Sequence, residues 1–262
     1  MSARLLQADW RPMVGVAPQT RDLLAPTGRL RVGIAVGSAI SAVWTKHDLT
    51  TNQPVGPTVD LAAIFAERTG LPLALVEYGS SGEIIKAASA GEWDVSFTPV
   101  DAERKASVDF GPSFALGEST YMVPDGSPIF SLGDVDHTGM HVFGVENTAT
   151  IRAARQSLRN TTAIGLASLE EVLAKFRNGE ADAIALGRES LLSLQQDFPA
   201  ARILDGHFLA LGTAVAVPKG KAVALDVFSG LLEELKADGT VRKIFDKYGM
   251  TGTTVAPAGY HS

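Results

Sequence analysis

The chain has no cysteine, no long apolar run and no excess of positive charge, and each absence excludes a class of protein. Without cysteine among its 262 residues, it has no disulfide, no cysteine-bound metal and no thiol nucleophile. No apolar run approaches the roughly 18 residues that suggest a membrane-spanning helix. A formal net charge of −6, with no compensating basic cluster, argues against a nucleic-acid or anionic-membrane surface.

Familiar enzyme motifs are also missing. The sequence contains no Gly-x-Ser-x-Gly, His-Glu-x-x-His, P-loop or Gly-x-Gly-x-x-Gly pattern. The histidines are scattered along the chain, and neither a metal site nor a cofactor is expected. These absences favour a protein that binds a molecule over one that transforms it.

The first residues do not look like a secretion signal. They include arginines but lack the unbroken apolar core of roughly 7–15 residues that a signal peptide carries. Two expectations remain open: a signal was removed before this sequence was written, or the protein stays in the cytoplasm.

What the sequence does contain is a repeated α/β unit. The stretch 91–110, GEWDVSFTPVDAERKASVDF, begins where a helix ends at Gly91 and continues as a strand at residues 93–97. Its opening recurs as GEADA at residues 179–183. Ligands of such sheets bind beyond the carboxyl ends of the strands. The two units therefore predict two α/β lobes with a binding site between them.

The order of expected elements supports two lobes joined by two crossings. A β-α-β-α-β succession runs from residue 30 to residue 97, and a second α/β set follows residue 141. Strands at 119–123 and 209–217 each end in a turn rich in proline and glycine, and we expect them to form a hinge. The expected division is an N-terminal arm at 1–28, lobe 1 at 29–120 and 214–250, lobe 2 at 121–213, and a mobile tail at 251–262.

Five short motifs, in this order and spacing, resemble the bacterial extracellular solute-binding proteins of family 3 over about residues 28–249. They are Gly56-Pro57-Thr58-Val59-Asp60-Leu61, Gly91-Glu92-Trp93-Asp94, Arg104 with Val108-Asp109-Phe110, Gly179-Glu180-Ala181-Asp182-Ala183, and Leu235-Lys236-x-x-Gly239. The resemblance implies the two-lobed type II periplasmic-binding-protein fold, a periplasmic location and service to an ABC importer of amino-acid-like solutes. It also implies that Arg104 holds the carboxylate of the ligand. By itself, Arg104 is more simply explained as a surface arginine paired with Asp101 or Asp109.

The chain departs from the family pattern at two places. Where amino-acid binders carry an acidic residue for the ligand ammonium, it has Gly187 and Arg188. Where they place a stacking aromatic, it has Gly37 and Ser38, and we expect Ser38 to help hold the ligand. An ammonium without a carboxylate partner is costly in a closed cleft, so we expect a carboxylate ligand, dianionic if both Arg104 and Arg188 engage it. Glu118 could still hold a cation.

The remaining site candidates each have a plainer alternative. Residues 147–149 (Asn147, Thr148 and Ala149) begin a helix, where free N–H groups favour an anion, but they could simply cap that helix. Trp44 could cover the cleft or pack locally within its loop. Phe97 and Thr98, which end the strand of the central stretch, are expected at the edge of the cleft. Arg188 could pair with the adjacent Glu189 at the surface.

These observations predict a monomeric two-lobed α/β solute-binding protein. It captures a small carboxylated molecule and delivers it to the membrane subunits of an ABC importer. Two alternatives remain. One is an enzyme similar to cyclohexadienyl dehydratase on the same fold, with Glu118, Glu146 or Glu189 at the border of the cleft as general acid, and the other is a ligand-sensing module.

Overall fold

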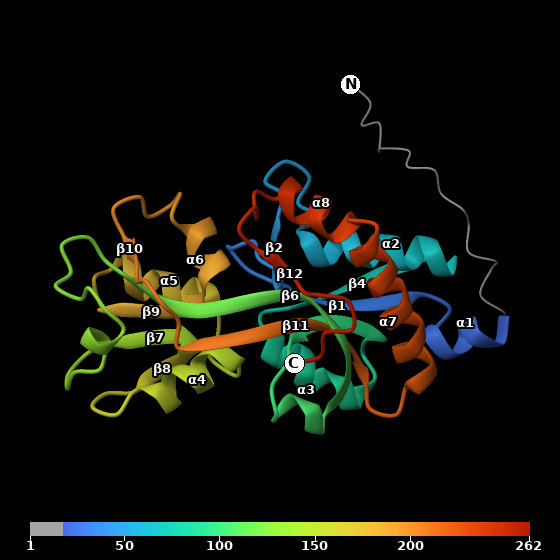
Figure 1. The fold of residues 1–262 in the computed structure, drawn as a ribbon, viewed down its shortest axis with the longest axis horizontal. Coiled ribbons are helices and arrows are strands. Elements are labelled where there is room, and N and C mark those ends of the chain that lie inside the picture. Colours follow the sequence, from blue (N-terminus) through green and yellow to red (C-terminus); the bar gives the residue numbers. More distant parts are fainter. Residues whose placement is uncertain (1–17) are drawn as a thin grey trace.

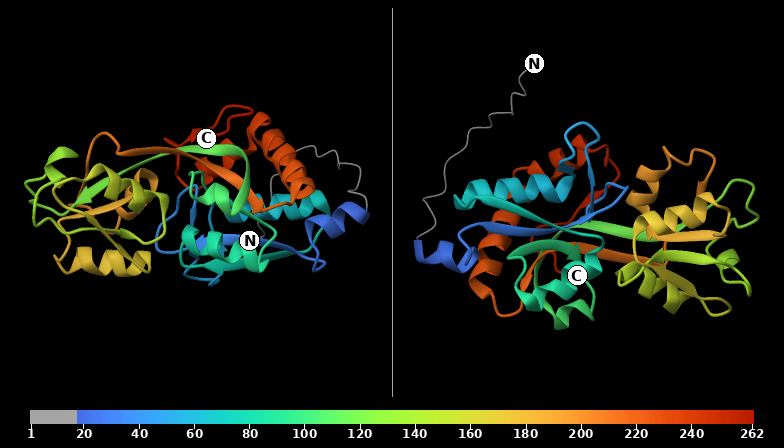
Figure 2. Two further views of the ribbon diagram at one scale, coloured as in Figure 1. Left: turned by 90° about the horizontal axis from the view of Figure 1, so that it is seen from below. Right: turned by 180° about the vertical axis from the view of Figure 1, so that it is seen from behind.

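The computed structural model describes residues 18–262, and it has two groups of elements joined by two long strands (Figures 1 and 2). Its twelve strands form a single mixed sheet with the main order β3-β2-β1-β5-β11-β6-β9-β7-β8. Strands β4, β10 and β12 pair with members of this path. None of the helices in the described part of the chain is long and apolar enough to cross a membrane.

The larger group, which we call lobe 1, contains the first and last parts of the described chain (Figure 1). Its central strands are parallel: β1 pairs with β2, β4 and β5. Its elements are α1 (Pro18–Leu24), β1 (Leu30–Val36), β2 (Trp44–His47), β3 (Pro54–Val55), α2 (Pro57–Thr69), β4 (Leu73–Tyr78), α3 (Ser81–Ala87), η1 (Ala88–Ala90), β5 (Val95–Pro99), η2 (Arg104–Ala106), α7 (Ala222–Ala237), α8 (Thr240–Lys247) and β12 (Thr254–Val255).

The smaller group, lobe 2, is built around parallel strands β7, β8 and β9, with helices on both faces (Figure 1). Its elements are η3 (Gly133–Val135), β7 (Val142–Val145), α4 (Ala149–Ser157), β8 (Ala163–Leu166), α5 (Leu169–Arg177), β9 (Ala183–Gly187), α6 (Arg188–Leu194) and β10 (Arg202–Ile203).

Local sequence signals set the ends of these helices. Helix α2 ends at Gly70, whose φ of 66° is the left-handed conformation that glycine adopts most readily. The Ser168 side chain accepts a hydrogen bond from the Glu171 backbone N–H at the start of α5, as the capping pattern in the sequence predicts. Ser80 caps α3 in the same way through the Glu83 N–H.

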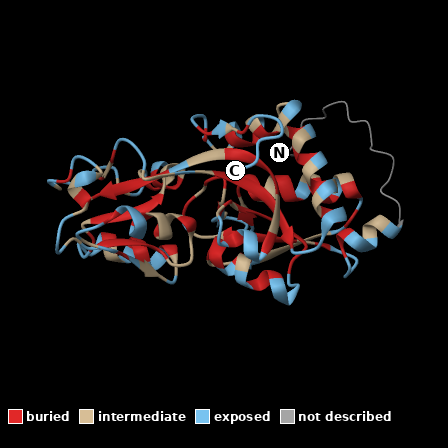
Figure 3. Cartoon of the chain, turned by 60° about the horizontal axis from the view of Figure 1, so that its bottom comes forward, coloured by how far each residue is buried: buried red, intermediate tan, exposed pale blue. Residues whose placement is uncertain are grey.

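Two strands carry the chain between the lobes. Strand β6 (Val108–Val123) pairs with β11 (Leu209–Pro218) along most of its length, and then with β9 of lobe 2. Strand β11 also pairs with β5 of lobe 1. The predicted hinge of two crossing strands is therefore present, and both strands are largely buried where they run through the lobes (Figure 3).

The two ends of the chain differ from the expected arm and mobile tail. Residues 1–17 of the arm lie outside the described residues, and residues 18–24 form α1, whose Leu24 is buried. In the tail, β12 pairs with β6, and Ala256 is buried and donates its N–H to the Phe114 carbonyl. These pairings satisfy backbone groups on β6, and the mobility of the rest of the tail stays a prediction.

Phe97 lies in the core of lobe 1, so the expectation that it borders the cleft is not met. The side chain is 1% exposed, and its ring centroid lies 5.5 Å from that of Phe65 and 5.6 Å from that of Phe114. Side chains alternate between the faces of a strand, and the face of β5 that carries Val95 and Phe97 is covered by the apolar cluster of lobe 1.

Replacing Phe97 with leucine is expected to lower the free energy of unfolding by about 1 kcal/mol without changing solute affinity. Hydrophobic substitutions of similar volume in a packed core usually cost less than about 1.5 kcal/mol. Because the ring is surrounded by core residues, the cleft should keep its shape. Urea unfolding measures the free energy of unfolding, and calorimetric titration of the same preparation measures the solute affinity. A large loss of affinity with little loss of stability would show instead that Phe97 borders the cleft.

Candidate functional site

A cavity of about 90 Å³, which we call the cleft, lies where the two lobes meet the crossing strands. Both lobes and β6 contribute side chains to its wall: Ser41, Trp44, Ser81 and Pro99 from lobe 1; Thr148, Ala149, Arg188 and Glu189 from lobe 2; and Glu118 and Ser119 from β6.

The lobes touch each other around the cleft. The Ser38 hydroxyl donates to Glu170 Oε1 at 2.8 Å, and the Ile40 N–H donates to Ser193 Oγ at 3.3 Å. Trp44 of lobe 1 belongs to the same apolar cluster as Leu169 of lobe 2. The structure is therefore a closed arrangement of the two lobes, and this closure explains why the cavity between them is small.

Arg104 lies buried immediately behind the wall of the cleft. Its side chain is 2% exposed, in the short helix η2 that follows β5. One terminal nitrogen, Nη1, donates to the Pro99 carbonyl at 3.2 Å, and the other, Nη2, donates to Ser81 Oγ at 2.9 Å. Both acceptors line the cleft. Nη2 also donates to the Asn147 carbonyl of lobe 2 at 3.3 Å.

Arg104 remains positively charged at neutral pH although it is buried. Burial lowers the pKa of Arg104 to about 10, and the Asp101 carboxylate opposes part of that fall. Asp101 Oδ2 lies 3.4 Å from Arg104 Nε, yet Nε makes no hydrogen bond to any residue that the structure describes. A guanidinium that is charged near neutral pH, and not fully hydrogen-bonded, is available to an incoming carboxylate.

The start of α4 forms the facing wall from lobe 2. The Thr148 hydroxyl accepts a hydrogen bond from the Ile151 N–H at 3.2 Å, so the capping alternative holds for Thr148. Asn147 has a φ of 61°, a left-handed conformation in which asparagine is tolerated. Thr148 and Ala149 line the cleft, and a role for their backbone N–H groups in holding an anion stays a prediction.

Arg188 lines the cleft but is already occupied. Its Nε lies 3.2 Å from Glu118 Oε2, and its Nη2 donates to the carbonyls of Leu204 and Gly206. The partner is thus Glu118 rather than the adjacent Glu189. Glu118 also lies 3.1 Å from His207 Nδ1, so Arg188 belongs to a local polar cluster and is not a second free cation.

Glu189 lines the cleft, as the sequence suggested for this carboxylate, although it was not included among the ligand-binding candidates. It lies in the first turn of α6, and its Oε2 accepts from the Ala42 N–H of lobe 1 at 3.4 Å. Burial raises the pKa of Glu189, while the Thr253 hydroxyl and the Ala42 N–H oppose part of the rise. The available signal was its position two residues after Gly187, on the same end of β9.

The ten candidates are thus divided by the structure. Five line the cleft together, namely Trp44, Glu118, Thr148, Ala149 and Arg188. Arg104 and Asn147 meet behind it. Trp44 is buried in β2 and not in a loop. Thr98 is fully buried in β5, Phe97 lies in the core, and Ser38 is exposed at the seam between the lobes.

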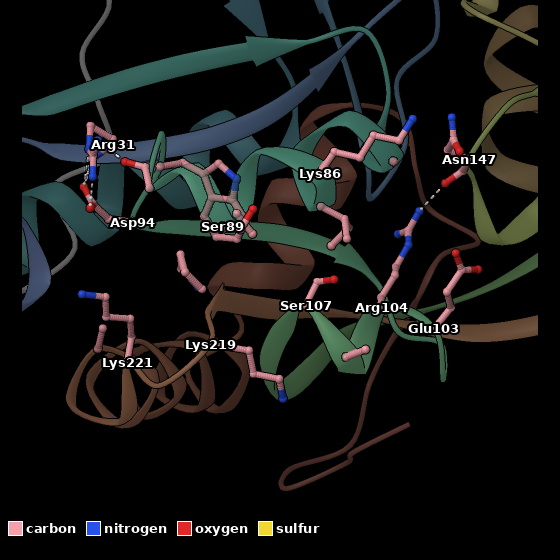
Figure 4. A pocket seen from close by; sticks show the side chains of 18 of the residues that line it. Arg31, Lys86, Ser89, Asp94, Glu103, Arg104, Ser107, Asn147, Lys219 and Lys221 are labelled. Atoms are coloured by element: carbon pink, nitrogen blue, oxygen red, sulfur yellow. Dashed lines mark hydrogen bonds and ion pairs between the residues drawn. The ribbon is translucent and has the colours of Figure 1, made fainter.

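A second and larger depression opens on the other side of Arg104. It has a volume of about 810 Å³ and extends over lobe 1 to the seam (Figure 4). Arg104, Glu103 and Asn147 lie at one end, and the ion pair of Arg31 with Asp94 lies at the other. Arg104 thus lines this groove, while its terminal nitrogens bond to Ser81 and Pro99 on the wall of the cleft.

In comparisons with known proteins, this chain matches one family model and many solved structures. The model of the family described as bacterial extracellular solute-binding proteins, family 3, matches residues 34–251. A search of curated proteins finds no match.

Three solved structures illustrate the likeness of fold. A mutant of ArgBP from T. maritima has 21% identity and a TM-score of 0.77, over 88% of this chain and 99% of that one. AbpA from Streptococcus pneumoniae, bound to L-arginine, has 20% identity and a TM-score of 0.76, over 86% and 96%. The ancestral amino-acid-binding protein AncCDT-1, a precursor of cyclohexadienyl dehydratase, has 24% identity and a TM-score of 0.77, over 87% and 99%.

Proposed function

This chain belongs to the bacterial extracellular solute-binding proteins of family 3, and we propose that it captures a small carboxylated solute between its lobes. The observation that carries the proposal is Arg104, buried, charged and bonded to two groups that line the cleft. A solute carboxylate would take the place of weaker neutral acceptors on this guanidinium.

Glu189 supports a solute that also carries a positive charge. A carboxylate beside an enclosed cavity is stabilised by a cation, and the raised pKa of Glu189 indicates that the protein alone does not stabilise the ionised form. With Arg188 already paired to Glu118, the cleft offers one cation and one carboxylate. This pairing fits an amino-acid-like solute better than the dianion expected from the sequence.

Binding in such a cleft works through the relative position of the lobes. We take residues 29–120 with 214–250 and residues 121–213 as the two units that move. The cavity is small in the closed arrangement, so the solute enters when the lobes are apart. A solute shifts the equilibrium only by its differential affinity for the closed state, which contacts to Arg104 and to lobe 2 together would supply.

The setting that we propose follows from the family. The protein acts as a monomer in the periplasm and hands its solute to the membrane subunits of an ABC importer. Its family consists of extracellular solute-binding proteins.

A thermal-shift screen against amino acids, opines and organic acids tests the proposal. A compound at one hundred times its dissociation constant stabilises the folded state by about 2.7 kcal/mol, which is easily measured. Mass spectrometry of each stabilising compound after incubation completes the test. At least one carboxylated compound should stabilise the protein and be recovered intact.

The same screen decides the second candidate, an enzyme on this fold. The raised pKa of the Glu189 carboxyl, in contact with the cleft, is the property that a general acid needs. A dehydratase would return its substrate without water. Detection of a dehydrated product would show that the protein is an enzyme and not a transport protein.

Replacing Glu189 with glutamine is expected to raise the melting temperature near neutral pH and to weaken binding of amine-bearing solutes. Because the folded-state pKa of this acid is raised, its contribution to stability is greatest at low pH and is lost as pH rises through that pKa. The neutral glutamine avoids this loss, so the two proteins should converge below about pH 4. Melting curves across this pH range check the result.

The matched control is Glu67→Gln, which changes an exposed carboxylate on α2 of lobe 1. It should leave both stability and binding close to the wild-type values. Equal behaviour of the two variants would remove Glu189 from the site.

A further inference from the structure

A second arginine, Arg152 of α4, shares two partners with Arg104: the Asp101 carboxylate of lobe 1 and the Asn147 carbonyl of lobe 2. Arg152 Nη1 donates to the Asn147 carbonyl at 3.2 Å, the carbonyl that also accepts from Arg104. Arg152 Nη2 pairs with Asp101 Oδ2, the atom nearest Arg104 Nε. One carboxylate of lobe 1 and one carbonyl of lobe 2 therefore each lie between two guanidinium groups.

Asp101 lies between the two arginines, and its hydrogen bond goes to the Arg152 side chain and not to the Arg104 side chain. Its Oδ1 accepts from the Arg104 backbone N–H at 2.9 Å, and its Oδ2 makes a direct hydrogen bond to Arg152. The Arg104 Nε, 3.4 Å from the same Oδ2, is left without a hydrogen bond to any residue in the described chain. An unsatisfied buried donor beside a carboxylate would otherwise pair with it.

The charges of this cluster balance only because of Arg152. Arg104 and Arg152 face Asp101 and Glu103, and Arg152 Nε pairs with Glu103 Oε2 at 2.8 Å. Without Arg152, one buried guanidinium would be flanked by two carboxylates. A negative solute would then meet like charges close to its binding group, which disfavours binding.

We propose that Arg152 is a positioning residue for solute binding, which occupies Asp101 and Glu103 so that the Arg104 guanidinium stays free for a carboxylate. The inference rests on the proposed capture of a carboxylated solute beside Arg104. Arg104 bonds to Ser81 and Pro99 of the cleft wall, whereas the partners of Arg152, namely Asn147, Asp101 and Glu103, do not line the cleft, so Arg152 acts through Arg104. Because Arg152 belongs to lobe 2 and its carboxylate partners to lobe 1, this arrangement exists only while the lobes are closed.

The test follows the Arg104 Nε–H signal by NMR in protein with isotope-labelled arginine, assigned by its loss in Arg104→Lys. In solute-free Arg152→Gln, Asp101 is released, so the Arg104 Nε–H should form a hydrogen bond and shift downfield. The double variant Arg152→Gln with Asp101→Asn should shift back toward the wild-type position. Arg155→Gln is the control, since Arg155 lies on the same helix but pairs with Glu146 inside lobe 2.

Acetate is then added to the same samples, with chloride at equal ionic strength as the reference. The shift of the Arg104 Nε–H signal measures how readily Arg104 binds a carboxylate. The wild-type signal should respond to acetate, and Arg152→Gln should need at least about tenfold more acetate for the same response. Equal responses of the two proteins, or an unchanged solute-free signal in Arg152→Gln, would overturn the role of Arg152 alone. A wild-type signal that ignores acetate would overturn the proposed function as well.

Discussion

Replacing Gly82 with alanine is expected to weaken solute binding by ten- to a hundredfold while leaving the fold intact. Gly82 lies in α3 of lobe 1, directly against Asn147 of lobe 2. A Cβ at residue 82 would lie 2.4 Å from the Asn147 Cβ and 2.5 Å from its carbonyl oxygen. Overpacking of this kind typically costs about 1–3 kcal/mol, and here the closed state alone bears the cost.

The effect on stability should have the opposite sign. Alanine is favoured over glycine within a helix by roughly 0.5–1 kcal/mol, and Gly82 has no need of a left-handed backbone. The open protein should therefore be as stable as the wild type or slightly more so. Titration calorimetry measures the solute affinity. Small-angle scattering measures the separation of the lobes.

The matched control is Gly230→Ala in α7. A Cβ there would meet no atom within 4 Å, so the helix gains the same stabilisation from alanine without obstructing the contact between the lobes. Tight solute binding by Gly82→Ala would show that binding does not require the lobe contact seen here.

Replacing Arg104 with alanine is expected to weaken binding of a carboxylated solute by more than about 2 kcal/mol, or roughly thirtyfold. The side chain is buried beside the cleft, so its removal leaves a solute carboxylate without its charged partner. The loss should appear mainly in the dissociation rate, because the contact is formed only after the lobes enclose the solute. Surface plasmon resonance separates the two rates.

Arg155→Ala serves as the control for that experiment. It removes a similar charge from lobe 2, where Arg155 forms a partly exposed pair with Glu146 at 2.7 Å. Such pairs contribute little to stability, so affinity and melting temperature should change little. Unchanged affinity in Arg104→Ala would remove Arg104 from the site.

The architecture was predictable because it depends on patterns that persist along the chain. Alternating apolar residues, helix caps such as Ser168 and the repeated Gly-Glu-x-Asp opening identified the elements and their order. The crossing strands were visible as apolar runs ended by Pro124 and Pro218. The short strand β12 was missed because it forms by pairing with β6, a strand far away in the sequence.

The chemistry of the site was less predictable because it depends on partners that the sequence does not reveal. Arg188 and Arg104 look alike as residue types, yet Glu118 and two carbonyls occupy Arg188. The Nε of Arg104, 3.4 Å from Asp101, makes no hydrogen bond to a described residue. The face of β5 that Phe97 occupies is decided by which side the lobe 1 core covers. Glu189 enters the cleft because β9 ends beside it and α6 begins at once.

The most direct test of the account compares a carboxylate with its carboxamide. The stabilising acid from the thermal-shift screen and its primary amide are titrated into the wild-type protein by calorimetry, and into Arg104→Ala in parallel. We expect the amide to bind the wild type at least roughly thirtyfold more weakly, and the difference to shrink in the variant. Equal affinities of the acid and the amide for the wild type would contradict the claim that Arg104 holds a solute carboxylate in the cleft.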